Sequence, residues 1–263
     1  MKSKFQEFTD SQWEVIEKIL DDQRKRKHPL RVILNAIFFV NNTGVQWRNL
    51  DSKYPPRETI FCHFTQFKAC GVWEEILDSM VVMERKSQAK EPTPSLLVTD
   101  SQSVKKMQFV GQKTGIDGGK NVNGGKRTIL VDTLGLPLSI KVTAANVSDN
   151  QAGILAVDLL KGKVPRLQKI TADLGYKNTF VDYVSSTYEW EVEIAQKPES
   201  SRGFIPQKNR WQVERSFGCG SPPGLNFRPV RRCRRLFGDV EKTISSAEAM
   251  LQIAFISFII NRL

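Results

Sequence analysis

The sequence predicts an α/β fold, a mixed sheet flanked by helices that follows an all-helical N-terminal region. Residues 1–86 carry apolar positions at helical spacing. Residues 87–94 are polar and contain two prolines, which is typical of a linker. From residue 95 to residue 263, short β-rich runs alternate with helical segments. We therefore expect a helical region, a linker and a sheet-containing domain with these bounds.

Local signals mark the helices of residues 1–86. Thr9 followed by Gln12 fits a capping box at the start of the first helix. Pro29 suits the first turn of the second helix, which is expected to end near Gly44. Two more helices are expected before the linker. Short helices joined by short turns could form a helix-turn-helix-like reader of DNA, or a small bundle that only packs against the rest of the chain.

The second part of the chain predicts strands and helices in a defined order. The strands are expected at 96–99, 127–131, 138–143, 167–172 and 191–196, and the helices at 149–161, 178–188, around 214 and from Ser245 to 263. Gly135 marks a hairpin turn between the second and third strands. This order is similar to the ribonuclease H-like layout, in which the first and fourth strands are neighbours.

Three acidic residues are candidates for one site. Asp100 and Asp173 each follow an apolar run, and Glu214 lies in a short helical stretch. Carboxylates at the carboxyl ends of strands can converge with a third on a later helix. The histidines, His28 and His63, are far away in sequence, and oxygen ligands alone favour Mg²⁺. Alternatively, each aspartate is a strand-end turn residue, and the glutamate is a surface acid paired with a nearby arginine.

Other acids of the same domain have simpler interpretations. Asp132 is expected in a turn, and Asp149 at a helix cap.

The charge of the chain indicates a polyanionic partner such as DNA. The net charge is +11 and the estimated pI is 9.6. Residues 102–130 carry six Lys/Arg against one acid, and residues 202–242 carry ten against three. Any one of these cations could instead be a solvated surface charge. The candidates for phosphate contacts are Lys105, Lys126, Arg127, Arg210 and Arg215.

Composition excludes several other classes. The four cysteines lack metal-ligand spacing and, in a chain of this length, give no sign of a disulfide framework. The N-terminal residues lack the apolar core of a secretion signal. The longest apolar stretch, 250–260, is too short to span a bilayer. We therefore expect a cytoplasmic protein.

Several motifs occur in a characteristic order over nearly the whole chain. They lie at residues 9–20, 30–48, 100–105, 126–135, 143–149, 172–176, 210–217 and 246–250. Together they resemble the IS5-type (IS4/IS5-like) family of bacterial insertion-sequence transposases. The resemblance implies a ribonuclease H-like DDE catalytic domain behind a helical region that binds the element ends.

The resemblance also implies a site and partners. Asp100, Asp173 and Glu214 correspond to the DDE residues, which would hold two Mg²⁺ ions, or Mn²⁺ in their place. The implied activity is strand cleavage and strand transfer on DNA. The implied partners are the terminal inverted repeats, target DNA and a second copy of the chain, because two ends are brought together.

The chain departs from the family pattern after the glutamate. Gln207 and Ser221 occupy positions where a tyrosine and a lysine are expected, and residues 218–233 contain a Gly/Pro-rich insertion. Gly costs about 1 kcal/mol and Pro about 3 kcal/mol inside a helix, so a continuous helix is not expected there. Two alternatives to an active transposase stay open. One is a transposase-derived DNA-binding protein that has lost catalysis, and the other is a nuclease with the same ribonuclease H-like fold.

Overall fold

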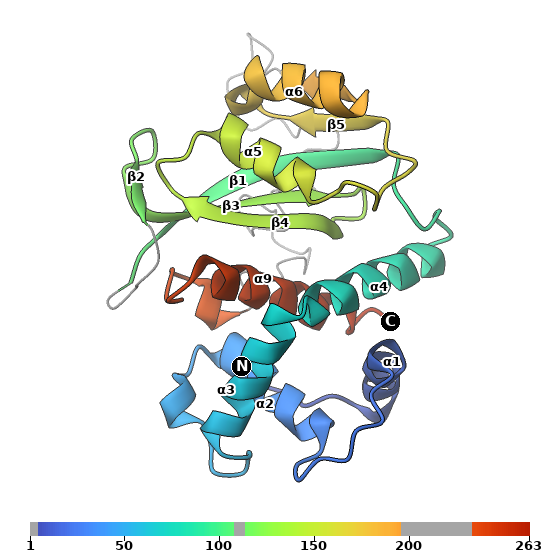
Figure 1. Cartoon of the computed structure of the whole chain (residues 1–263), viewed down its shortest axis with the longest axis vertical. Helices are drawn as coiled ribbons and strands as arrows, with labels where there is room; N and C mark the ends of the chain where they lie inside the picture. Colours follow the sequence, from blue (N-terminus) through green and yellow to red (C-terminus); the bar gives the residue numbers. More distant parts are fainter. Residues whose placement is uncertain (1–4, 108–113, 196–232) are drawn as a thin grey trace, which may run out of the picture.

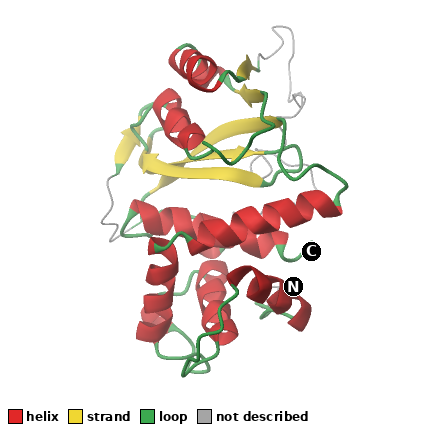
Figure 2. Cartoon of the chain, turned by 45° about the vertical axis from the view of Figure 1, so that its right-hand side comes forward, coloured by secondary structure: helices red, strands yellow, loops and turns green. Residues whose placement is uncertain are grey.

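A computed structural model of the chain describes residues 5–107, 114–195 and 233–263. Its centre is a mixed sheet with helices on both faces (Figure 1). Helices α5 (Asp149–Asp158) and α6 (Thr179–Tyr188) cover one face, and α4 (Val72–Ser87) and α9 (Ile244–Ile259) lie along the other. The remaining N-terminal helices lie beyond α4 and α9, on the side away from the sheet (Figure 2). The expected α/β class is confirmed.

The sheet has six strands within the described ranges. They are β1 (Leu96–Lys105), β2 (Gly115–Asp117), β3 (Val122–Val131), β4 (Pro137–Ala144), β5 (Lys169–Ala172) and β6 (Glu191–Ile194). The order is β2-β3-β1-β5-β6, and β4 pairs with β3. The pairs β1–β3 and β3–β4 are antiparallel, whereas β1–β5 and β5–β6 are parallel. This is the ribonuclease H-like arrangement, because β1 and β5, the first and fourth of the expected strands, are neighbours.

The N-terminal helices begin and end where the local signals predict. They are α1 (Asp10–Leu20), α2 (Leu30–Thr43) and α3 (Arg57–Ala69). The capping box is present: the amide of Gln12 donates to Thr9 Oγ1 at 3.3 Å, and the amide of Thr9 donates to Gln12 Oε1 at 3.1 Å. Gly44 ends α2 with a φ of 72°, in the left-handed region that glycine adopts without strain.

Helix α9 connects the two parts of the structure. Its buried side chains belong to one apolar core with residues of α2, α3, α4 and the inner face of the sheet. A second core lies between the other face and helices α5 and α6. This last helix corresponds to the one expected from Ser245 to 263. It begins earlier than expected, because Thr243 provides the cap by accepting from the Ser246 amide at 3.2 Å.

Several strands differ from the prediction. β3 begins at Val122, five residues before its expected start at Arg127, and β5 begins at Lys169 instead of Leu167. β1 was expected to end at Thr99, but it continues to Lys105 because β3 pairs with it along this whole length. Asp100 therefore lies within β1 and not at its end. The short strand β2 was not expected. The expected helix around Glu214 and residues 218–232 of the insertion lie outside the described residues.

The described helices have at most 16 residues. None of them, in the three described stretches, is both long enough and apolar enough to cross a membrane.

Candidate functional site

The sheet brings Asp100 and Asp173 together. The parallel pairing of β1 with β5 reaches Val98 opposite Thr171. Asp100 lies two residues after Val98, and Asp173 lies two residues after Thr171. If the same register continues, the two aspartates are opposite each other. Neighbouring strands are about 4.8 Å apart. The two carboxylates therefore leave the sheet side by side, at the end of the β1–β5 ladder.

Backbone amides hold both carboxylates in place. The amide of Ser101 donates to Asp100 Oδ1 at 2.7 Å. The amide of Gly175 donates to Asp173 Oδ1 at 2.9 Å, at the start of the short helix η2 (Leu174–Tyr176). Charge-assisted bonds from fixed backbone donors restrict the orientation of a carboxylate. Each aspartate is thus oriented by its own chain segment.

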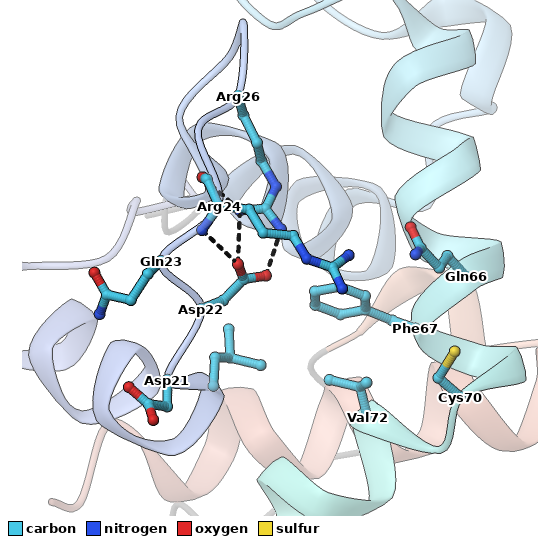
Figure 3. Close-up of a pocket in the computed structure, with 10 residues that line it drawn as sticks. Asp21, Asp22, Gln23, Arg24, Arg26, Gln66, Phe67, Cys70 and Val72 are labelled. Carbon is cyan, nitrogen blue, oxygen red and sulfur yellow. Dashed lines mark hydrogen bonds and ion pairs between the residues drawn. The ribbon is translucent and has the colours of Figure 1, made fainter.

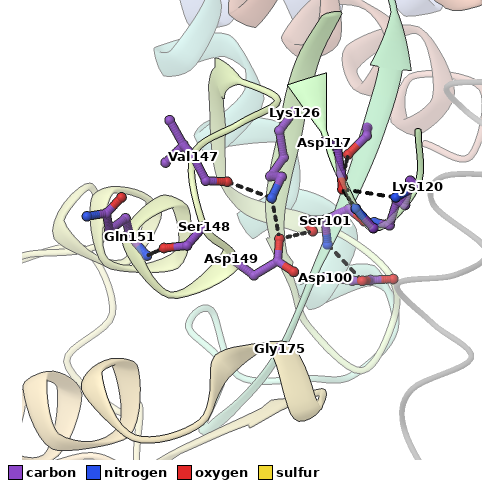
Figure 4. A network of polar contacts seen from close by, with 12 residues as sticks. Asp100, Ser101, Asp117, Lys120, Lys126, Val147, Ser148, Asp149, Gln151 and Gly175 are labelled. Carbon is purple, nitrogen blue, oxygen red and sulfur yellow. Dashed lines mark hydrogen bonds and ion pairs between the residues drawn. The ribbon is translucent and has the colours of Figure 1, made fainter. Parts of the chain in front are cut away.

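A third acid, Asp149, belongs to the same cluster (Figure 4). Its Oδ1 atom accepts from Ser101 Oγ at 2.7 Å and from Lys126 Nζ at 2.8 Å. A Cβ atom added to Gly175 would lie 2.8 Å from Asp149 Oδ2 and 3.0 Å from Asp173 Oδ1. The carboxylates of Asp149 and Asp173 therefore border the same point.

The sequence interpretation missed the position of Asp149. It was expected to cap α5, but the cap is Ser148, whose hydroxyl accepts from the Gln151 amide at 3.3 Å. Asp149 is the first residue of the helix. The available signal was an acid soon after a predicted strand, within the motif at residues 143–149.

Tyr176 is near enough to the three carboxylates for each of them to affect its pKa. Its side chain is fully buried, and burial raises its pKa well above the usual value, with Asp100, Asp149 and Asp173 contributing in the same direction. The nearby Thr99 hydroxyl acts on the pKa in the opposite direction, although neither hydroxyl has a hydrogen-bond partner in the described part of the chain. The phenol therefore stays protonated next to the acidic cluster.

The predicted phosphate contacts occupy different environments. Lys105 is exposed at the end of β1. Lys126 is buried, and its ammonium also donates to the Val147 carbonyl at 2.7 Å. Lys120, which the sequence interpretation did not single out, is exposed and donates to the Ser101 carbonyl at 3.3 Å.

Arg127 is buried as well. It donates to the carbonyl of Leu236 at 2.9 Å and to that of Gly238 at 3.5 Å, and burial lowers its pKa to about 10. Lys126 and Arg127 are thus engaged inside the protein and do not extend toward solvent. Glu214, Arg210 and Arg215 lie outside the described residues.

A cavity of about 600 Å³ lies away from these acids, at the turn that follows α1 (Figure 3). Arg24 extends toward the ring of Phe67 across it. Arg26 forms an ion pair with Asp22, so part of the basic run at 24–27 is already neutralised. The cavity therefore contributes neither a carboxylate cluster nor an uncompensated basic patch.

The donor chemistry of the acidic cluster fits a divalent cation. Asp100 and Asp173 supply hard carboxylate oxygens from adjacent strands, and Mg²⁺ prefers such ligands. Across the described ranges, no group of three or more His, Cys, Asp or Glu side chains is arranged so that it could hold a metal ion. Further ligands would have to come from the rest of the chain, from DNA or from water.

Two family models match the sequence. Residues 8–77 match a family described as "Putative transposase of IS4/5 family". Residues 91–222, just over half of the chain, match a family described as "Transposase DDE domain". Among curated proteins no match was found.

Three solved structures are similar to the chain, all at 14% sequence identity. The match to the Mos1 strand transfer complex has a TM-score of 0.25 and covers 65% of this chain and 60% of the Mos1 chain. A Mos1 transposase paired-end complex with the left transposon end has a TM-score of 0.25 and covers 65% and 61%. A Mos1 mariner paired-end complex with Mn has a TM-score of 0.24 and covers 70% and 65%. The chain thus spans about three fifths of the length of these proteins.

Proposed function

Because this chain belongs to the DDE transposases of the IS4/IS5 type, we propose that it cuts an insertion element out at its ends and joins those ends to target DNA. The observation that supports this proposal is the register that puts Asp100 level with Asp173 on adjacent parallel strands. Two carboxylates so placed can act together on one phosphate group.

Asp100 and Asp173 would bind divalent cations, Mg²⁺ in the first place, with Glu214 as a further ligand. The ions, when bound, would activate the attacking hydroxyl and stabilise the leaving oxygen. The role of the chain itself is to fix the two carboxylates. Ser101 and Gly175 do this through their amides, and a preorganised site loses little free energy to reorientation during the reaction.

The reaction would consist of two in-line displacements at phosphorus. In the first, water attacks the phosphate at the element end, the bond to the 3′ oxygen breaks, and a 3′-hydroxyl is left. In the second, that hydroxyl attacks a phosphate of the target strand, and the target's own 3′ oxygen leaves. Both steps have the same geometry, so one site serves both.

Exposed cations near the cluster would hold the DNA backbone. Lys105 and Lys120 lie on the β1 side of the site, and Arg210 and Arg215 stay predictions from the sequence. Residues 1–86 would read the element ends, 87–94 would link the two regions, and 95–263 would form the catalytic domain. A homodimer on DNA would bring two ends together.

The test is cleavage of a DNA duplex that carries the element's own ends, with and without Mg²⁺. The wild-type chain is expected to cut only with the ion, and Asp100→Asn and Asp173→Asn to cut at least about 100-fold more slowly. Asp158→Asn, at the far end of α5, is the control and is expected to cut at the wild-type rate.

Other outcomes would favour the alternatives. A chain that binds the ends and never cuts is a DNA-binding protein without catalysis. A chain that cuts unrelated duplexes equally well is a nuclease.

A further inference from the structure

A buried lysine lies next to the acidic cluster. Lys126, on β3, is 4% exposed, and its ammonium donates to Asp149 Oδ1 at 2.8 Å and to the Val147 carbonyl at 2.7 Å (Figure 4). A buried ammonium without a partner is strongly unfavourable. Lys126 therefore needs a nearby anion, and Asp149 is the anion with which it forms an ion pair.

Asp149 is linked to both predicted cation-binding aspartates through neighbouring residues. On one side, its Oδ1 atom accepts from the hydroxyl of Ser101, whose amide binds Asp100. On the other side, its Oδ2 atom borders Gly175, whose amide binds Asp173. Asp149 is thus connected through one residue to each of them.

Loss of Asp149 would redirect the lysine. An ammonium on a flexible four-carbon stem moves readily to another anion. Asp149 separates the ammonium from Asp173: its Oδ1 atom binds the ammonium, and its Oδ2 atom borders the same point at Gly175 as Asp173 Oδ1. A lysine paired with the Asp173 carboxylate would compete with a divalent cation for the same oxygens.

We propose that Asp149 is a positioning residue: it holds the Lys126 ammonium away from Asp173, so that the Asp173 carboxylate binds a divalent cation and not the lysine. This inference rests on the proposed function, because it takes Asp100 and Asp173 as the cation ligands. Asp149 is not itself a ligand in this scheme, since its Oδ1 atom already accepts two hydrogen bonds.

The test is calorimetric titration of the full chain with Mn²⁺ in the absence of DNA. Asp149→Ala is expected to weaken Mn²⁺ binding about 10- to 100-fold, the range typical of residues that support metal ligands. The double variant Asp149→Ala/Lys126→Met is expected to bind within a few-fold of the wild type, because the competing ammonium is gone.

The rescue by the second substitution distinguishes this role from others. A double variant as weak as Asp149→Ala would overturn the proposal, because it would mean that Asp149 binds the cation directly or only stabilises the fold. Wild-type affinity in Asp149→Ala would also overturn it. If the alanine variants do not fold, judged by circular dichroism, Asp149→Asn with and without Lys126→Met keeps the side-chain shape and is expected to show a smaller loss and the same rescue.

Two sets of controls separate this inference from the proposed function. Asp158, on the same helix, accepts hydrogen bonds from Tyr183 and Tyr188, far from the cluster. Asp158→Ala is therefore expected to leave Mn²⁺ affinity unchanged. Asp100→Ala and Asp173→Ala are expected to weaken binding in every case. If these two have no effect, the proposed cation site fails. If they do and the Asp149 series shows no loss or no rescue, only the present inference fails.

Discussion

Arg85 of α4 and Asp132 of the β3–β4 turn form an ion pair inside the protein, with side chains that are 6% and 0% exposed. Asp132 also accepts the amides of Leu134 and Leu136, at 2.8 and 2.9 Å. It is therefore the turn residue that the sequence predicts, and through Arg85 it also joins helix α4 to the sheet.

Removal of the arginine is expected to destabilise the fold strongly. Arg85→Ala leaves the Asp132 carboxylate buried without its cation, which typically costs about 3–5 kcal/mol. Urea unfolding measures this loss. Glu58→Ala, which breaks the exposed Arg57–Glu58 pair, is the control and is expected to change stability by less than about 1 kcal/mol. Equal effects of the two substitutions would show that the buried pair does not stabilise the fold.

Lys105 and Arg127, both predicted as phosphate contacts, are expected to behave in opposite ways. Lys105→Ala should reduce the slope of log binding constant against log salt concentration, for a DNA duplex, by about one. It should leave the free energy of unfolding unchanged. Arg127→Met should leave that slope unchanged and cost about 1–3 kcal/mol, because buried carbonyls of Leu236 and Gly238 lose their donor. Fluorescence anisotropy at several salt concentrations and urea unfolding give the two readouts. A reduced slope in the arginine variant would restore it as a DNA contact.

A side chain at position 175 is expected to reduce activity by displacing the carboxylates of the acidic cluster, and to leave the fold unchanged. In Gly175→Ala the new Cβ atom would lie 2.8 Å from Asp149 Oδ2 and 3.0 Å from Asp173 Oδ1. The carboxylates must then shift, and a displacement of about 1 Å can cost about 100-fold in rate. DNA cleavage measures the effect. The matched change Gly118→Ala, where a Cβ atom meets nothing within 4 Å, should cut normally, and a loss of activity there would point to a general effect on the chain.

All four tyrosines are expected to ionise late in the folded protein. The pKa of Tyr54 is raised to about 12 by burial, that of Tyr176 lies well above the usual value, and those of Tyr183 and Tyr188 are raised too. Unfolded tyrosine has a pKa of about 10. Between these values the folded state keeps protons that the unfolded state has lost, so stability present below pH 10 should fall as the pH rises toward 12.

Ultraviolet titration of phenolate absorbance checks this expectation. The native protein should show little phenolate at pH values where the urea-unfolded chain is already half ionised. Tyr54→Phe should remove one of the late-titrating groups without changing the others. A full tyrosine step near the ordinary pKa in the folded protein would contradict the burial of Tyr176 near the acidic cluster.

The features that the sequence predicts well depend on contacts between near neighbours. The capping box of Thr9 and Gln12 and the turns at Gly44 and Gly135 involve residues only a few positions apart. The strand order followed from the alternation of elements, because few topologies suit a given order. This was sufficient to predict that Asp100 and Asp173 would emerge from neighbouring strands.

The missed features depend on contacts that local patterns do not encode. Asp149 joins the cluster through Ser101 and Lys126, which are 48 and 23 positions away. The extension of β1 was missed because residues 100–105 lack an apolar run, and pairing with β3 makes them a strand. A buried arginine such as Arg127 has the same appearance in a sequence as an exposed one. Burial of charge is decided by tertiary packing.

The location of α9 has a consequence for folding of the chain during its synthesis. Residues 244–259 fill the space between the N-terminal helices and the sheet, and they complete the apolar core that both share. A nascent polypeptide lacking this helix would leave that core open on the ribosome. Chaperones and proteases would meet it in this state, and a chain truncated ahead of this helix is expected to lack a closed core.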